Sequence, residues 1–140
     1  MSHQCKNIML KCMDFRLQKN TLGWLQQNGY FGDCDVISNA GSGKVLADGT
    51  ADAKEFVLSE IGISYEKHGA RNIIIVHHSD CGAYSSYNFT TPEEEKAKQL
   101  EDIAIEEALI KERFPGITVV KVWAQMKDSE GNEVEFQIIQ

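Results

Sequence analysis

The stretch that decides the fold is Asn72–His78, which reads Asn-Ile-Ile-Ile-Val-His-His. Its apolar run leaves no polar face, so an extended segment here must be covered on both sides by other parts of the chain. A strand that is apolar on both faces is typical of the centre of a parallel sheet. We therefore predict a buried central strand over residues 72–78.

The flanking segments alternate between strand and helix patterns. Short apolar runs predict further strands, and amphipathic stretches that end at Gly or Pro predict helices between them. A turn at residues 128–132 joins the last two strands as an antiparallel hairpin. The predicted strands cover residues 7–12, 34–38, 117–126 and 134–139, and the predicted helices cover residues 22–28, 50–68 and 91–113. This order predicts a three-layer α/β sandwich with a mostly parallel central sheet and an antiparallel edge hairpin.

Bulk properties narrow the possible functions. The chain has 140 residues, which is the size of one domain. Its net charge of −7 argues against a nucleic-acid partner, because such binding needs basic side chains for the phosphates. No apolar run approaches the roughly 20 residues that span a bilayer, so we expect no membrane partner. The first residues lack a signal-peptide pattern, and we expect a cytoplasmic protein.

Sulfur and imidazole donors are predicted to gather at one edge of the sheet. Cys12 ends the first predicted strand, His78 ends the central one, and Cys81 lies three residues further on. The carboxyl ends of parallel strands meet at one edge, where α/β proteins bind their ligands. Two thiolates and one imidazole suit Zn²⁺, and three protein ligands leave a fourth position open, as in catalytic zinc sites. We therefore expect a single zinc-binding α/β domain, residues 1–140, with Zn²⁺ as its cofactor.

The cysteines and histidines also have competing interpretations. Cys12 by itself is more typical of a buried core cysteine. His77 is a rival to His78, but strand alternation points the two rings to opposite faces, and only His78 has the His-x-x-Cys spacing. Cys5 and Cys34 each lie near the start of a predicted strand. We expect two reduced thiols, with a disulfide at the sheet edge away from the zinc as the alternative.

A carboxylate and a guanidinium follow the first ligand closely. Asp14 lies two residues from Cys12, where it can accept a proton from zinc-bound water or bind the zinc itself. Arg16 can pair with Asp14 in a bidentate fork, which would keep the carboxylate ionised and oriented. A merely structural ion pair is the alternative.

Other polar residues are expected to have ordinary roles. Thr91 is a predicted N-cap, and Glu94 completes a capping box. The acidic run over residues 93–96 is predicted to be a solvated helix start. We predict that Asp80 is a turn residue or a helix cap, and that His68, like His3, is solvated.

Two short motifs together resemble the β-class carbonic anhydrases. Residues 12–16, Cys-Met-Asp-Phe-Arg, are similar to the family's Cys-x-Asp-x-Arg motif, and residues 78–82, His-Ser-Asp-Cys-Gly, are similar to its His-x-x-Cys motif. Residues 39–41, Asn-Ala-Gly, are similar to its Arg-Asn-Ala-Gly segment, with Ser38 in the place of the Arg. The order of elements resembles that of the family over residues 6–126.

The resemblance implies zinc-dependent, reversible hydration of carbon dioxide to bicarbonate, a carbonate dehydratase activity. Zinc would lower the pKa of its bound water toward about 7, and the resulting hydroxide would attack carbon dioxide. Asp14 would orient that hydroxide, or bind the zinc in an inactive closed form, and Arg16 would hold Asp14. Backbone N–H groups around Gly41 and Gly82 would line the substrate site, since glycine permits close approach.

The resemblance also implies a homodimer or a higher homo-oligomer, with the active-site cleft at the subunit interface. Aromatic side chains are the candidates to line that cleft, namely Phe15, Tyr30, Phe31, Tyr84 and Tyr87. The substrate would be a small molecule, carbon dioxide or bicarbonate. Two alternatives stay open: a hydrolase of an analogue, carbon disulfide or carbonyl sulfide, at the same site, and a non-catalytic zinc or thiol sensor.

Overall fold

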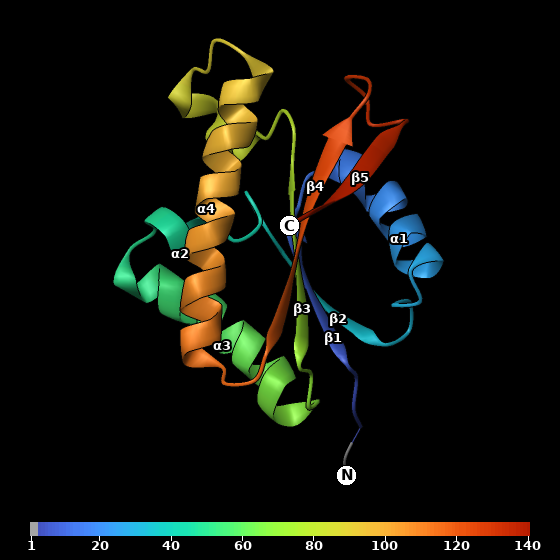
Figure 1. Ribbon diagram of the computed structural model, residues 1–140, viewed down its shortest axis with the longest axis vertical. Helices are drawn as coiled ribbons and strands as arrows, with labels where there is room; N and C mark the ends of the chain where they lie inside the picture. The colour runs from blue at the N-terminus through green and yellow to red at the C-terminus, as the bar shows by residue number, and fades with distance from the viewer. Residues whose placement is uncertain (1–2) are drawn as a thin grey trace.

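A single five-stranded sheet forms the middle layer of the protein, which we describe from a computed structural model over residues 3–140. The strand order is β2-β1-β3-β4-β5, with three parallel pairings and one antiparallel pairing between β4 and β5. The helix over residues 18–27 covers one face, and the helices over residues 44–48, 51–67 and 92–113 cover the other (Figure 1). The strands are β1 (Asn7–Cys12), β2 (Cys34–Asn39), β3 (Asn72–His78), β4 (Thr118–Met126) and β5 (Val134–Ile139). The predicted three-layer α/β sandwich with an antiparallel edge hairpin is confirmed.

The central strand β3 divides the core into two parts. Ile73 and Ile75 pack toward the three-helix side, whereas Ile74 and Val76 pack toward the single helix on the other side. All four side chains are fully buried. Their burial explains the continuous apolar run, because both faces of β3 lose contact with water.

The helices are α1 (Gln18–Gln27), α2 (Lys44–Asp48), α3 (Ala51–Lys67) and α4 (Pro92–Arg113), with 3-10 turns at Phe15–Leu17 and Gly82–Tyr87. Of the four α-helices, α1 begins earlier than predicted, because the turn at Phe15–Leu17 leads directly into it. The short helix α2 was not predicted, since it follows a loop with two glycines. Thr91 caps α4 as predicted, although the Glu94 carboxylate binds Thr90, one residue before the predicted partner.

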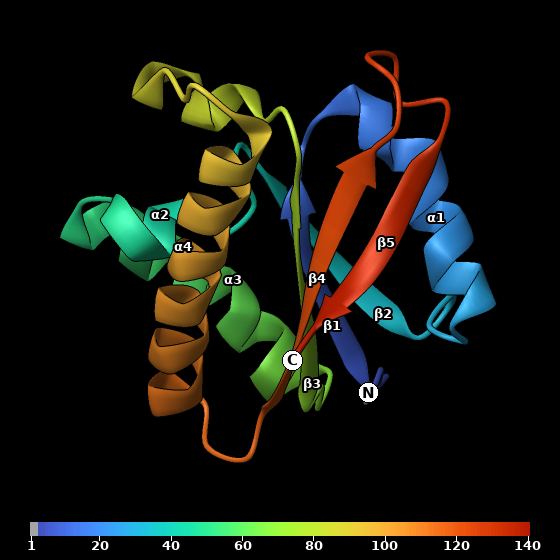
Figure 2. The ribbon, with the colours of Figure 1, turned by 45° about the horizontal axis from the view of Figure 1, so that its top comes forward.

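The sheet register brings three strand ends to one edge. Cys12 pairs with Asn39 at the end of β1 and β2, and Lys11 pairs with Val76 two residues before the end of β3. The loops that leave these ends gather at the top of the molecule in Figure 1, and Figure 2 turns this edge toward the viewer. Within residues 3–140, no helix combines the length and the apolar character needed to cross a membrane.

Candidate metal centre

The three predicted ligands lie together at this edge. Cys12 is the last residue of β1, His78 is the last residue of β3, and Cys81 follows in the loop after β3. All three side chains are buried, and one donor atom from each lies within 4.8 Å of the others. The Sγ atoms of Cys12 and Cys81 are 3.9 Å apart. Residues from three places in the chain thus form one compact donor set.

The His78 ring is oriented as a metal ligand. Its Nδ1 lies 2.7 Å from the carbonyl oxygen of Ser79, so this nitrogen carries the proton and donates it. Its Nε2 therefore presents a lone pair, and this buried atom has no hydrogen-bond partner among the described residues. Tetrahedral Zn²⁺ with Zn–S bonds of about 2.3 Å requires the sulfurs to lie about 3.8 Å apart, close to the distance observed. The donor set therefore fits zinc.

The two thiols are prepared to bind a cation. The hydrogen bond between the Cys12 and Cys81 sulfurs lowers the pKa of the Cys12 thiol and raises the pKa of the Cys81 thiol. The backbone N–H of Gly41 also donates to Cys12 Sγ at 3.4 Å. Gly41 has a φ of 74°, and a Cβ there would lie 2.9 Å from the Cβ of Ala83. Only glycine fits here, so the loop after β2 can support the ligand sulfur directly.

Asp14 and Arg16 form the predicted fork beside the ligands. Asp14 Oδ1 accepts hydrogen bonds from the backbone N–H of Arg16 at 2.9 Å and from its Nε at 3.1 Å, and Oδ2 accepts from Nη2 at 2.7 Å. The Arg16 guanidinium holds the pKa of Asp14 below its usual range, although partial burial acts in the opposite direction. Asp14 Oδ2 lies 3.9 Å from His78 Nε2. An ionised carboxylate thus faces the donor set.

The other side of Arg16 is held by two further loops. Its Nη1 contacts Asp80 Oδ2 at 3.0 Å and the carbonyl oxygen of Ser129 at 3.3 Å, and its Nη2 donates to the Asp80 carbonyl at 2.9 Å. Gly131, in the loop between β4 and β5, packs against the backbone of Arg16, because a Cβ on it would lie 2.6 Å from the Arg16 carbonyl oxygen. Asp80 lies in a turn, as predicted, and also binds Arg16, which the sequence did not show.

Glu95 supports the ligand loop from the first turns of α4. Its Oε1 accepts the backbone N–H of Asp80 at 3.0 Å, and its Oε2 accepts the backbone N–H of Cys81 at 2.9 Å. Gln99 donates to Glu95 Oε2 at 2.8 Å and to the carbonyl of His78 at 2.9 Å. The prediction of a solvated helix start is therefore wrong for Glu95. Glu95 and Gln99 are four residues apart and therefore share one face of the helix, which is the sequence feature that could have indicated their joint role.

Two cavities adjoin the centre. The smaller, of about 180 Å³, borders Cys12 and Asp14, and the larger, of about 690 Å³, borders Cys81, Asp14 and Arg16. Asp14 and one predicted ligand line each cavity, Cys12 the smaller and Cys81 the larger, so the smaller one is the better candidate for a small substrate by its size alone. Its lining residues are Cys12, Met13, Asp14, Ala40, Gly41, Gly82 and Ala83. The predicted substrate-side glycines, Gly41 and Gly82, are thus both at this cavity.

The rival ligand His77 is engaged elsewhere. It is buried on the α4 side of the sheet, where Nδ1 lies 2.9 Å from Gln99 Oε1 and Nε2 lies 2.8 Å from Glu106 Oε2. Burial disfavours a charge on His77, but the Glu106 carboxylate outweighs it and raises the pKa of His77. Burial likewise raises the pKa of Glu106. His77 therefore forms a buried hydrogen-bonded pair that connects β3 to α4.

Two other predictions are wrong, one of them only in part. Tyr84 cannot line a subunit interface, because it is fully buried within its own chain and its hydroxyl donates to Asp102 at 2.6 Å. Phe15, in contrast, is 84% exposed beside the centre. The prediction for His68 is wrong in part, because its ring contacts the Asp35 carboxylate at 2.5 Å while its side chain stays 25% exposed.

Comparisons with known proteins agree with this geometry. A family described as putative carbonic anhydrase matches residues 2–135. An uncharacterized protein of Rickettsia bellii is 27% identical over 122 residues, which cover 84% of this chain and 74% of that protein.

Two solved structures share the fold. The β-carbonic anhydrase isoform I of Trichomonas vaginalis has a TM-score of 0.60 at 20% identity, covering 98% of this chain and 84% of that one. A tetrameric β-carbonic anhydrase of Sordaria macrospora has a TM-score of 0.54 at 15% identity, covering 96% of this chain and 81% of that one. The chain therefore belongs to the putative carbonic anhydrase family, as a divergent relative of the β-class carbonic anhydrases.

Proposed function

We propose that this protein hydrates carbon dioxide reversibly to bicarbonate, with Zn²⁺ held by Cys12, His78 and Cys81. The observation that carries the proposal is the buried Nε2 of His78, which has no hydrogen-bond partner within residues 3–140 and lies near the thiols of Cys12 and Cys81 and 3.9 Å from the Asp14 carboxylate. A buried lone pair without a donor is costly unless a ligand satisfies it. Three protein ligands leave one position for water, as in catalytic zinc sites.

When bound, zinc would supply the Lewis acidity that makes hydroxide available from water near neutral pH. Asp14 is ionised and can only accept hydrogen bonds, so it fixes the direction in which the nucleophile points its proton. Arg16 keeps Asp14 in that state through the fork at 2.7–3.1 Å. Arg16 is thus a positioning residue, and Asp14 is the group that touches the reacting atoms.

The cavity of about 180 Å³ suits a small substrate. Gly82 adds no side chain to this cavity, and no other atom beyond its two chain neighbours lies within 4 Å of the place that a Cβ on it would take. Carbon dioxide is small and uncharged, so it can enter beside Cys12 and Asp14 without a countercharge. Bicarbonate formed there would meet the ionised Asp14 carboxylate, and repulsion between the two anions favours product release.

We also propose that the protein works as a homo-oligomer. Phe15 and Met13 are 84% and 61% exposed and flank Asp14, next to the candidate substrate cavity. Large apolar side chains exposed together mark interaction surfaces. The Sordaria macrospora relative described as tetrameric adds support. Sedimentation velocity at micromolar concentration should show a dimer or larger species, and a monomer would contradict this proposal.

Stopped-flow hydration of carbon dioxide by zinc-loaded protein tests the activity. We expect a rate well above buffer for the natural chain. An Asp14→Asn variant should bind zinc as tightly but lose most of that rate, because the amide can present a donor where an acceptor is needed. No rate above buffer from fully zinc-loaded protein would refute the proposal. Turnover of carbon disulfide in place of carbon dioxide would assign a different substrate to the same centre.

A further inference from the structure

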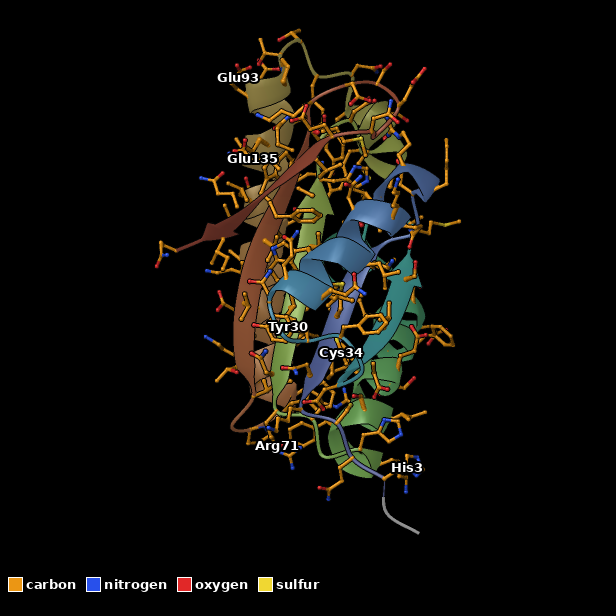
Figure 3. All side chains as sticks on the ribbon, turned by 90° about the vertical axis from the view of Figure 1, so that its right-hand side faces the viewer. His3, Tyr30, Cys34, Arg71, Glu93 and Glu135 are labelled. Atoms are coloured by element: carbon orange, nitrogen blue, oxygen red, sulfur yellow. The ribbon has the colours of Figure 1, made fainter. Side chains whose placement is uncertain are left out.

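A second cluster of possible metal ligands lies at the opposite edge of the sheet. Cys5 precedes β1, Asp35 is the second residue of β2, and His68 is the C-cap of α3. One donor atom from each lies within 4.8 Å of the others. Cys5 and Cys12 are seven positions apart, and residues 7–12 are the strand β1, which places the two clusters about 20 Å apart. Figure 3 shows the neighbouring His3 at the lower end of the molecule, far from the loops at the top.

Three side-chain hydrogen bonds of this cluster converge on one oxygen, and Cys5 Sγ also lies 3.5 Å from the Asn7 carbonyl oxygen. Asp35 Oδ2 accepts from Cys5 Sγ at 3.5 Å, from Ser64 Oγ at 2.6 Å and from His68 Nδ1 at 2.5 Å. The backbone N–H of Cys5 also donates to the His68 carbonyl at 3.1 Å. The thiol and the imidazole therefore direct exchangeable protons at a carboxylate. A divalent cation can replace such protons, because it binds the deprotonated forms of the same groups.

A pocket beside the cluster gives a second, independent observation. It has a volume of about 280 Å³, and Asp35, Ser64, His68 and Glu60 are among its lining residues. Glu60 Oε1 is a buried oxygen with no hydrogen-bond partner among the described residues. Glu60, Ser64 and His68 are four residues apart along α3, so they share one face of the helix. An unsatisfied carboxylate oxygen at this pocket indicates that a positively charged group is missing.

We propose that Cys5, Asp35 and His68 form a second metal site, which binds a divalent cation of the zinc class. One thiolate, one carboxylate and one imidazole are all zinc ligands, and the thiolate disfavours Mg²⁺ and Ca²⁺. The Cys5–Asp35 distance of 3.5 Å equals the S···O separation of about 3.5 Å expected in a tetrahedral zinc site. Binding forms a metal–sulfur bond and releases the thiol proton to solvent, with no change in oxidation state.

His3 is the candidate for the fourth ligand. Its ring centroid lies 4.8 Å from that of His68, and the His3 side chain is exposed. The side chains of Asp35 and His68 are 33% and 25% exposed, so an ion can reach them from solvent. A bound ion would connect the N-terminal segment to β2 and to the end of α3. The site would therefore stabilise the fold rather than take part in the chemistry at Cys12.

Cys34 provides a matched control. It lies next to Asp35 in the sequence, but it packs against the core on the α1 side, whereas Cys5 packs on the α3 side. Figure 3 shows Cys34 on the face that carries α1. The two thiols thus belong to opposite faces of the sheet, and Cys34 is outside the proposed site.

Calorimetric titration of the metal-free protein with Zn²⁺ tests the proposal. We expect two equivalents for the natural chain, one each for Cys5→Ser and Asp35→Asn, and two for Cys34→Ser. With Cd²⁺, thiolate-to-metal absorption should come from Cys5, Cys12 and Cys81 in the natural chain; Cys5→Ser should lose only the part from the second site, and Cys12→Ser should keep that part. The Cys12→Ser variant reports on the centre formed by Cys12, His78 and Cys81. A failure of zinc binding at that centre can therefore be distinguished from a failure at the proposed second site. Unchanged zinc stoichiometry in both Cys5→Ser and Asp35→Asn would overturn the proposal.

Discussion

Replacing Glu95 by Gln removes one charge while keeping the size and shape of a side chain that holds the ligand loop. Glu95 accepts three hydrogen bonds, from the backbone N–H groups of Asp80 and Cys81 and from the Gln99 amide. Two of these bonds arrive at Oε2 and one at Oε1. A glutamine has only one oxygen, so in either orientation its NH₂ group must face at least one donor.

The cost of this mismatch follows from general magnitudes. A buried donor without an acceptor costs about 1–3 kcal/mol. If that cost falls on the metal-binding conformation of the Cys81 loop, zinc affinity falls by about 5- to 150-fold. Substitution of the residues that support metal ligands elsewhere reduces metal affinity by about 10- to 100-fold. We therefore predict that Glu95→Gln weakens zinc binding by about 10-fold or more.

Competition with a chromogenic chelator measures this affinity directly. Glu94→Gln is the matched control, because Glu94 lies one residue away, is exposed, and its carboxylate accepts hydrogen bonds from Thr90, just before α4. Circular dichroism should show the same fold for both variants. Equal zinc affinity in Glu95→Gln and Glu94→Gln would refute the assigned role of Glu95.

Three further predictions concern the surroundings of the centre. Gly131→Ala should lower the free energy of unfolding by about 1–3 kcal/mol, measured by urea denaturation, because φ is 73° and the new Cβ would meet the Arg16 carbonyl. His77→Leu should lower it by about 3–5 kcal/mol, because Glu106 would remain buried without its partner; a loss below about 1 kcal/mol would contradict this reasoning. Arg16 lowers the pKa of Asp14 in the folded protein. The ion pair should therefore stabilise the fold fully above the ordinary aspartate pKa of about 3.9. This stabilisation should be lost as the pH falls through the lower pKa that Asp14 has in the folded protein. The free energy of unfolding of the metal-free natural chain and of Asp14→Asn should be measured as the pH is lowered. Their difference should shrink only at acidic pH, and a difference that grows on acidification would contradict this prediction.

The sequence was sufficient for the sheet and for the meeting of its strand ends. The apolar run of β3 could only be a strand covered on both faces, and parallel strands must present their carboxyl ends at one edge. Cys12 and His78 end their strands, so their proximity followed from the fold class alone. The ranges of β1 and β3 were predicted to the residue, and each strand begins at an Asn that opens an apolar run.

Contacts between loops and helix faces were not predictable in the same way. Glu95 has the sequence context of an ordinary acidic helix start, and only the path of the loop after β3 brings the Cys81 N–H onto its carboxylate. His68 likewise follows a helix as a typical polar residue, and its contact with Asp35 depends on how α3 lies against β2. Side-chain periodicity describes one element at a time, so it does not report which polar residues two elements will share.

A crystal structure of zinc-loaded protein, with anomalous scattering recorded at the zinc edge, tests the central claim most directly. We predict an anomalous peak at about 2.3 Å from the sulfurs of Cys12 and Cys81 and at about 2.0–2.1 Å from His78 Nε2. Bond lengths in these ranges would establish the ligand set. No peak among these three side chains in a zinc-saturated crystal, or a disulfide between Cys12 and Cys81, would contradict it.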